Sequence, residues 1–187
     1  MKHVKKVSRR TRVMAGGAVA VAIAAGGFGV YSAGAATEAA PAAAVAADAA
    51  DGNLIQTNHL TIEAAAKAAD AALDEAEKQN QRVSIAVVDR NGNTILTMRG
   101  DGAGPQSYEA AEKKAFTAVS WNAPTSELVK RLESAPTLKD IPGTLFLGGG
   151  APVAAKGGPI AGIGVAGAPS GDIDEKIAQA GVAALTG

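Results

Sequence analysis

The chain has 187 residues, with 18 basic and 18 acidic side chains, few aromatic residues and no cysteine. The absence of cysteine excludes disulfides, thiolate metal sites and cysteine nucleophiles. Six of the basic residues and none of the acidic ones lie in the first 36 positions, so residues 37–187 carry a formal charge of −6. This acidic remainder lacks the basic surface that nucleic-acid binding requires, and we expect no nucleic-acid partner.

Residues 1–36 have the pattern of a secretory signal peptide. A basic segment precedes an apolar run from Val13 to Val30, and Ala33-Gly34-Ala35 forms an A-x-A cleavage site. Arg9-Arg10 is the twin arginine of Tat signals, but the following residues match that motif only in part, so Sec export is the alternative. We therefore expect a secreted, extracellular protein, with a retained membrane anchor as the other interpretation.

The sequence after the signal predicts a linker and one small domain. The alanine-rich residues 37–51 predict a flexible linker, and residues 52–187 the domain. Helices are predicted over 61–79, 108–121, 125–132 and 172–185, and strands over 83–89, 94–99, 144–147, 152–155 and 160–165. Asn91-Gly92 and Lys156-Gly157-Gly158 predict hairpin turns. The order indicates an α+β fold: a largely antiparallel sheet of about five strands packed with helices.

The predicted helix starts depend on capping side chains. Thr61 and Ser107 are expected to be N-caps, and either Thr125 or Ser126 to cap the short helix. Asp172 with Glu175 three positions later resembles a capping box.

The sequence gives little support for a dinucleotide site or for a hydrolase with a Ser-His-Asp triad. Gly162, Gly164 and Gly167 match G-x-G-x-x-G, but two of them fall inside a predicted strand, so we interpret them as packing glycines rather than a dinucleotide site. A Ser-His-Asp triad would have to use His59, the only histidine after the signal, and no serine lies in a nucleophile-elbow context.

Three segments together carry a family resemblance: VSIAVVDRNGNTI, RGDGAGPQSYEAAEKKAFTAVSW and PGTLFLGGGAPVAAKGGPIAGIGVAGAPSGDIDEKIAQAGVAAL. In this order they resemble the GlcG/HbpS-like, or haem-degrading domain, family over about residues 60–185. The resemblance implies haem binding, iron binding and homo-oligomers, with octamers among the secreted members. It also implies a role as accessory sensor for a membrane-bound histidine kinase, while haem degradation with iron release has been ascribed to the family.

The resemblance implies an iron site on the first helix, where secreted members carry D-x-x-E. Asp74 and Glu77 fit this motif, and a spacing of three puts both carboxylates on one helix face. Asp70 lies one turn back and offers a third oxygen ligand for a hard cation. The alternative is a solvated face of ion pairs, because Glu63–Lys67 and Asp74–Lys78 are also suitably spaced.

Haem ligands are scarce after the signal. The usual axial types are represented only by His59, Met98 and Tyr108, of which His59 is the candidate we retain. The resemblance adds Thr117, since a threonine ligand has been assigned in a secreted member. Lys113 and Lys114 offer positive charge for haem propionates, and Lys113 is the retained candidate.

The sequence thus leaves three hypotheses of different classes. The first is a secreted, oligomeric haem- and iron-binding sensor in haem or oxidative-stress response. The second is an enzyme that degrades haem or protects against peroxide. The third is a structural or storage module without haem.

Overall fold

The computed structural model describes residues 47–186. The predicted signal peptide and most of the predicted linker lie outside these residues. Within the described part, a short 3-10 helix, Asp51–Asn53, precedes an irregular exposed segment that leads to the first α-helix. None of the helices in this part is long and apolar enough to cross a membrane.

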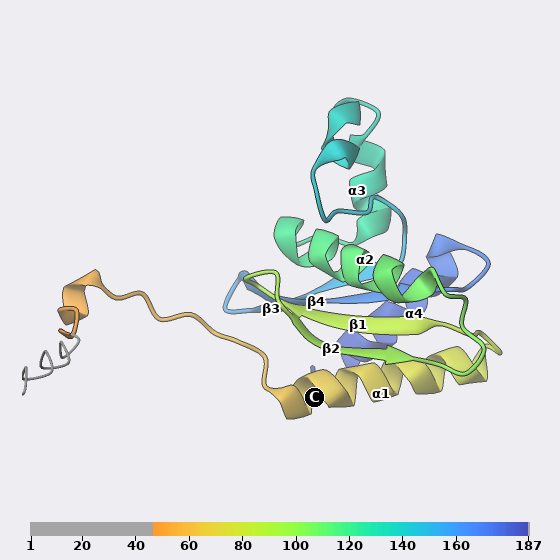
Figure 1. Ribbon diagram of the computed structural model, residues 1–187, viewed down its shortest axis with the longest axis horizontal. Helices are drawn as coiled ribbons and strands as arrows, with labels where there is room; N and C mark the ends of the chain where they lie inside the picture. Colours follow the sequence, from red (N-terminus) through yellow and green to blue (C-terminus); the bar gives the residue numbers. More distant parts are fainter. Residues whose placement is uncertain (1–46, 187) are drawn as a thin grey trace, which may run out of the picture. The chain divides into compact units, whose positions relative to one another are not determined.

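The described domain has four α-helices and one four-stranded sheet. In chain order the elements are α1 (Ile62–Lys78), β1 (Ser84–Asp89), β2 (Thr94–Arg99), α2 (Ser107–Trp121), α3 (Thr125–Arg131), the 3-10 helix η2 (Pro136–Asp140), β3 (Gly150–Ala155), β4 (Gly158–Ala166) and α4 (Gly171–Ala183). The sheet order is β2-β1-β4-β3 and every pairing is antiparallel. Helix α2 covers one face, while α1 and α4 pack on the other (Figure 1). The predicted α+β class is confirmed.

The sheet has four strands rather than about five, because the predicted strand over 144–147 does not form. This segment is attached to α2 instead: the Leu145 N–H donates to the hydroxyl of Thr117 at 2.8 Å. Phe146 is buried, and its ring meets that of Trp121 edge-on at a centroid distance of 5.3 Å. This short apolar run is therefore a loop that packs against α2. Hydrophobicity alone does not distinguish such a loop from a buried strand.

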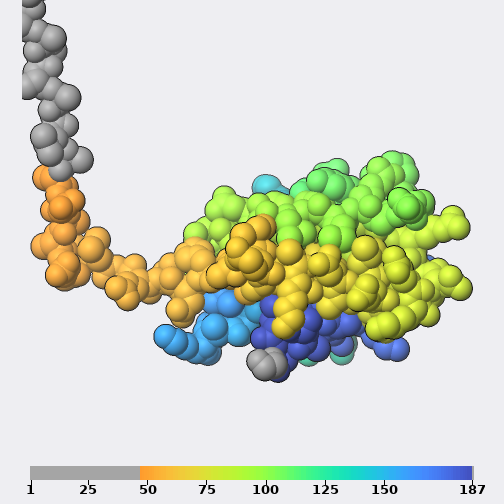
Figure 2. Space-filling model, turned by 90° about the horizontal axis from the view of Figure 1, so that it is seen from below, coloured from red at the N-terminus to blue at the C-terminus, as the bar shows by residue number. Residues whose placement is uncertain are grey.

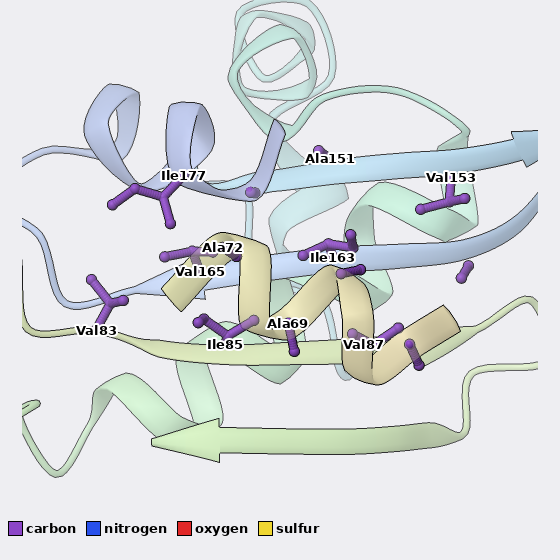
Figure 3. Packing of buried hydrophobic residues seen from close by; sticks show 14 of the residues in the cluster. Ala69, Ala72, Val83, Ile85, Val87, Ala151, Val153, Ile163, Val165 and Ile177 are labelled. Atoms are coloured by element: carbon purple, nitrogen blue, oxygen red, sulfur yellow. The ribbon is translucent and has the colours of Figure 1, made fainter. Parts of the chain in front are cut away.

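Alternation along the strands divides the core into two layers. Ile85 and Val87 of β1 and Ile163 and Val165 of β4 point toward α1 and α4 (Figure 3). Helix α1 contributes mainly alanine to this layer, and the fully buried ones are Ala65, Ala68, Ala69, Ala72 and Ala76. Such small side chains allow close helix–sheet approach, so the domain needs few large apolar residues.

Glycines of β4 set the distance between the sheet and α2. A Cβ atom on Gly164 would lie 2.0 Å from the carbonyl oxygen of Ala111, and one on Gly162 would lie 2.2 Å from that of Ala115. The backbone of α2 therefore rests directly on β4 at positions where no side chain fits. The interpretation of the G-x-G-x-x-G match as packing glycines is confirmed.

The helix starts agree with the predictions at Thr61 and differ elsewhere. The Thr61 hydroxyl accepts from Ala64 N–H at 3.2 Å, as an N-cap should. Ser107 lies inside α2, buried, and its hydroxyl contacts that of Ser84 on β1 at 2.8 Å. The N-cap of α4 is Ser170, and the predicted capping box of Asp172 and Glu175 is wrong because Glu175 is engaged with α3.

Candidate functional site

Helix α2 carries two adjacent lysines in opposite environments. Lys113 is partly exposed and its ammonium lies 2.6 Å from Oε1 of Glu109, one turn earlier. This hydrogen bond and the lysine charge lower the pKa of the Glu109 carboxyl. Lys114 is buried and donates to Oδ2 of Asp174 at 2.7 Å and to the Val165 carbonyl at 3.0 Å. Of the two lysines considered for propionates, only Lys113 is available to a ligand.

Thr117, one turn after Lys113, is fully buried. Its hydroxyl donates to the Lys113 carbonyl at 2.7 Å and accepts from Leu145 N–H at 2.8 Å. The hydroxyl thus donates within α2 and accepts from the segment over 144–147. This arrangement does not fit the predicted role of Thr117 as a haem ligand, because the oxygen is enclosed by the protein.

A shallow pocket lies beside Lys113, between α2 and the β1–β2 hairpin. We call it the Phe116 pocket; it has a volume of about 250 Å³ and is lined by Val88, Gly92, Thr94, Glu112, Lys113, Phe116 and Gly143. Gly92 has φ +88°, and a Cβ there would lie 2.8 Å from the Phe116 ring, so only glycine fits the turn over this ring. An aromatic wall with an ammonium at its edge suits a flat apolar ligand that carries an acidic group.

The turn between β1 and β2 is longer than the two residues that Asn91-Gly92 predicts. Pairing ends at Val88 with Thr94, and the side chain of Asp89 closes the turn. Its Oδ1 accepts from the backbone N–H of Asn91 and of Asn93, both at 2.8 Å. Asp89 therefore orders the residues that bring Gly92 over the Phe116 pocket.

His59 lies in the exposed segment before α1, and its Nε2 is 2.8 Å from the Thr57 hydroxyl. Its charge reaches the Asp89 carboxyl. Burial acts to raise the pKa of Asp89, but hydrogen bonds from Asn93 and Asn91 and the charge of His59 outweigh it, so this pKa lies below its usual value of 3.8. Lys113 thus lines the pocket beside this turn, and His59, on a different element, acts on the turn through its charge.

This relation gives a testable prediction. Replacing His59 by alanine should move the pKa of Asp89 upward, because a positive neighbour that favours the carboxylate is lost. In the parent protein, the stability contributed by Asp89 is present above its unfolded-state pKa and is lost as pH falls through its depressed folded-state pKa. NMR titration of the Asp89 carboxyl measures the shift, with Asn58→Ala, an exposed neighbour of His59, as control. An Asp89 pKa unchanged by His59→Ala would contradict the proximity.

The three predicted iron ligands lie on the exposed side of α1. Asp70, Asp74 and Glu77 are all solvent-accessible, and Figure 2 views the molecule from this side, with α1 in yellow. Among residues 47–186, no three His, Cys, Asp or Glu side chains come together as a metal-binding group. Asp70 therefore does not complete a three-ligand site, and Asp74 with Glu77 is the pair that remains.

The alternative to an iron site was that the exposed face of α1 is covered by ion pairs, and the described residues give this little support. On α1 the structure contains one ion pair, Lys78 with Glu75 at 3.9 Å, and neither of the two pairs that the spacing indicated. An exposed pair at this distance contributes little to stability.

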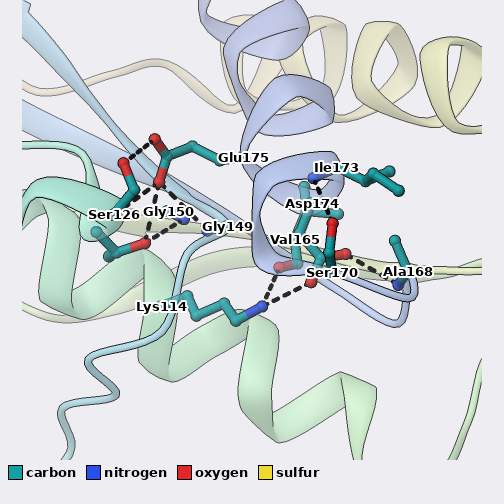
Figure 4. Close-up of polar contacts among 11 residues, drawn as sticks. Lys114, Ser126, Gly149, Gly150, Val165, Ala168, Ser170, Ile173, Asp174 and Glu175 are labelled. Atoms are coloured by element: carbon teal, nitrogen blue, oxygen red, sulfur yellow. Dashed lines mark hydrogen bonds and ion pairs between the residues drawn. The ribbon is translucent and has the colours of Figure 1, made fainter. Parts of the chain in front are cut away.

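Sequence reasoning missed a buried polar network at the start of α4. The carboxylate of Asp174 accepts a hydrogen bond from the Lys114 ammonium and another from the Ala168 N–H at 3.0 Å (Figure 4). Burial raises the pKa of the Asp174 carboxyl, with the hydrogen bond and charge of Lys114 acting in the opposite direction. The partners are 60 positions apart, so no local pattern in the sequence pointed to them.

The next residue, Glu175, completes this network on α3. Its carboxylate accepts from the Ser126 N–H at 2.9 Å and from the Ser126 hydroxyl, and lies 3.4 Å from the Gly149 N (Figure 4). Helix α3 has no side-chain cap of its own, so a residue of α4 satisfies its N-terminus. Lys114, Asp174 and Glu175 are therefore structural residues rather than ligand contacts.

The comparisons with known proteins agree with this fold. The family model described as "Haem degrading protein HbpS-like" matches residues 60–183. A crystal structure of a double mutant of HbpS from Streptomyces reticuli is 71% identical, with a TM-score of 0.75, over 76% of this chain and 98% of that one. Another HbpS crystal structure is 73% identical, with a TM-score of 0.73, over 75% and 99% of the two chains.

A more distant solved structure is a complex with haem. The crystal structure of PduOC with haem is 29% identical, with a TM-score of 0.63, and the match covers 68% of this chain and 95% of that one. The family match extends from just before α1 to the end of α4, and therefore includes every helix and strand that forms the sites described above, with His59 just outside it. The chain belongs to the HbpS-like family.

Proposed function

We propose that this protein binds haem in the Phe116 pocket. The observation that carries the proposal is a recess lined by the Phe116 ring and by the partly exposed side chain of Lys113, with Glu112 as its acidic residue. A likeness to the PduOC–haem complex and membership of a haem-related family support the same ligand. A recess of about 250 Å³ is smaller than most ligand pockets, so it receives one edge of the macrocycle and leaves the rest uncovered.

In this arrangement the chain supplies contacts rather than a strong ligand set. The Phe116 ring contacts the porphyrin, and Lys113 pairs with a propionate in exchange for Glu109. His59 is the candidate axial ligand, because it is exposed and its charge acts on Asp89, the residue that closes the turn over the pocket. Bound haem would supply redox-active iron at the surface of the protein.

Hemin titration of the purified protein tests this site. Thr94 is exposed at the pocket rim, so Thr94→Trp should fill the recess and weaken hemin binding by about tenfold or more, whereas Thr94→Val should change it little. Lys113→Gln should weaken binding by only about two- to fivefold, since this ammonium is partly exposed. The Soret band measures each titration.

Further variants assign the ligand. His59→Ala should change the position of the Soret band, and Thr117→Val should not, because the Thr117 hydroxyl is enclosed. Equal hemin affinity in Thr94→Trp and the parent protein would refute the pocket assignment.

We further propose that Asp74 and Glu77 bind iron on the exposed face of α1, with Asp70 outside the first coordination sphere. Two carboxylates at this spacing suit a hard cation, and neither is used in an ion pair in the described residues. Asp74→Ala with Glu77→Ala should weaken ferric-ion binding by about tenfold or more. Glu63→Ala, on the same helix, is the control, and equal loss in both would make the effect one of net charge.

The biological role we propose is that of a secreted homo-oligomer that reports haem or oxidative stress to a membrane histidine kinase. Exposed apolar residues at Leu54, Ile55 and Leu147 support association between subunits, for which an octamer is the proposed form. The export signal predicted over residues 1–36 supports secretion, with Tat as the proposed route. A single mass measurement in solution tests the octamer.

The second candidate function is enzymatic haem degradation, which the family description favours. Both candidates begin with the same bound haem and differ in its fate. A stable Soret band after hours with a mild reductant indicates binding and sensing, whereas progressive bleaching with release of iron indicates degradation.

A further inference from the structure

A second, polar pocket of about 410 Å³ lies where α1 ends, β1 begins and β2 ends. Its lining includes Arg82, Arg99, Glu77 and Asp101, with Leu73 as an apolar contribution. We call it the two-arginine pocket. It shares none of its lining residues with the Phe116 pocket, so the haem proposal does not use it.

Both arginines are positioned by the loop over 100–104. Arg99 Nη2 donates to the Ala103 carbonyl at 2.7 Å. Arg82 lies against Gly102, where a Cβ atom would come within 2.9 Å of the arginine Cδ and where φ is +77°. Neither guanidinium forms an ion pair with a carboxylate in the part of the chain that the structure describes. Both side chains are exposed, so the remaining N–H donors of Arg99, which is held by its bond to Ala103, and those of Arg82 are available to an anion.

Glu77 and Asp101 in the lining of the two-arginine pocket limit which anions suit it. Two arginines with Glu77 and Asp101 give the pocket a formal charge near zero, so a bare polyanion gains little there. A carboxylate prefers the guanidinium donors, while a hydroxyl or ammonium group prefers the acceptors Glu77 and Asp101. A ligand that carries both kinds of group satisfies both sides of the pocket.

We propose that the two-arginine pocket binds a small organic carboxylate that also carries a hydrogen-bond donor, such as a hydroxy acid. The carboxylate contacts Arg82 and Arg99, and the donor contacts Glu77 or Asp101. This proposal is independent of haem. Glu77 belongs both to this pocket and to the proposed iron site, so the two ligands would share Glu77 only if iron and the carboxylic acid were bound at the same time.

Calorimetric titration of purified protein in metal-free buffer tests the proposal with matched probes. Malate and succinate differ by one hydroxyl, so malate should bind about fivefold or more tightly. Arg82→Gln with Arg99→Gln should weaken malate binding by about tenfold or more. Arg90→Gln with Arg131→Gln, two exposed arginines outside the pocket, should leave it unchanged. Glu77→Ala with Asp101→Ala should abolish the preference for malate.

Three results would overturn the proposal. The first is no malate binding at about 10 mM, and the second is an equal loss in the Arg90/Arg131 control. The third is tighter binding of inorganic phosphate than of malate, which would identify a general oxoanion site instead. If the double arginine variant does not fold, Arg99→Lys keeps the charge but removes the fork of donors, and it should still weaken malate binding. Amide shifts of Gly100 and Asp101 on adding malate to the parent protein provide the independent measurement.

Discussion

Lys114→Met is expected to lower the free energy of unfolding by about 3–5 kcal/mol. Lys114 and Asp174 form a buried ion pair with side-chain exposures of 5% and 4%, so removing the ammonium leaves a carboxylate without its counter-charge. The loss should shrink as pH falls. Burial already raises the folded-state pKa of Asp174, and without Lys114 this pKa rises further, so the cost appears as pH rises through it. Urea denaturation at several pH values measures both effects.

The double variant Lys114→Met with Asp174→Leu is the control for this interpretation. Because it removes both charges together, it should be more stable than Lys114→Met alone, although the Ala168 N–H loses its acceptor. A single variant within about 1 kcal/mol of the parent protein would show that the pair contributes little.

Gly164→Ala is expected to destabilise the domain by about 3 kcal/mol or more. The new methyl group would meet the Ala111 carbonyl at 2.0 Å and the Ala115 nitrogen at 2.5 Å, so α2 would have to move away from the sheet. Both neighbouring atoms belong to a helix backbone, which cannot yield as a flexible side chain does. Thermal unfolding followed by circular dichroism measures the loss.

Gly158→Ala is the matched control in the same strand, because nothing lies within 4 Å of a Cβ at this position. It should be close to neutral, since this end of the strand is only half-buried and has room for a methyl group. Equal stability of the two variants would mean that α2 does not rest on β4 as closely as described.

The elements with strong local signals were predictable. The strand predicted over 83–89 and the helical spacing of α1 with its Thr61 cap are confirmed, as is the packing interpretation of Gly162 and Gly164. The segment over 144–147 was predicted wrongly because its partner is a threonine side chain on another element. Ser107 and Glu175 were assigned local capping roles, but each bonds to an element distant in sequence. Local patterns carry no information about such partners.

The candidate sites were predictable in part for the same reason. Sequence patterns placed Asp74 and Glu77 on one helix face and Lys113 on another helix. They did not indicate that Lys113 borders a recess, because this depends on Phe116, on Gly92 and on a turn closed by Asp89. Nor did they separate Lys113 from Lys114, which differ in environment only because α2 faces β4 and the start of α4.

The carboxylate of Glu175 makes the order of α3 depend on that of α4. Helix α3 has seven residues, too few to persist in water unaided, and its first turn is completed from α4. An event that unwinds the first turns of α4 would therefore remove the carboxylate contacts of a segment lying 50 residues earlier in the chain, together with that of the Gly149 backbone that leads into an edge strand. The least autonomous part of the protein is tied to its last helix, and the two should open and close as one unit.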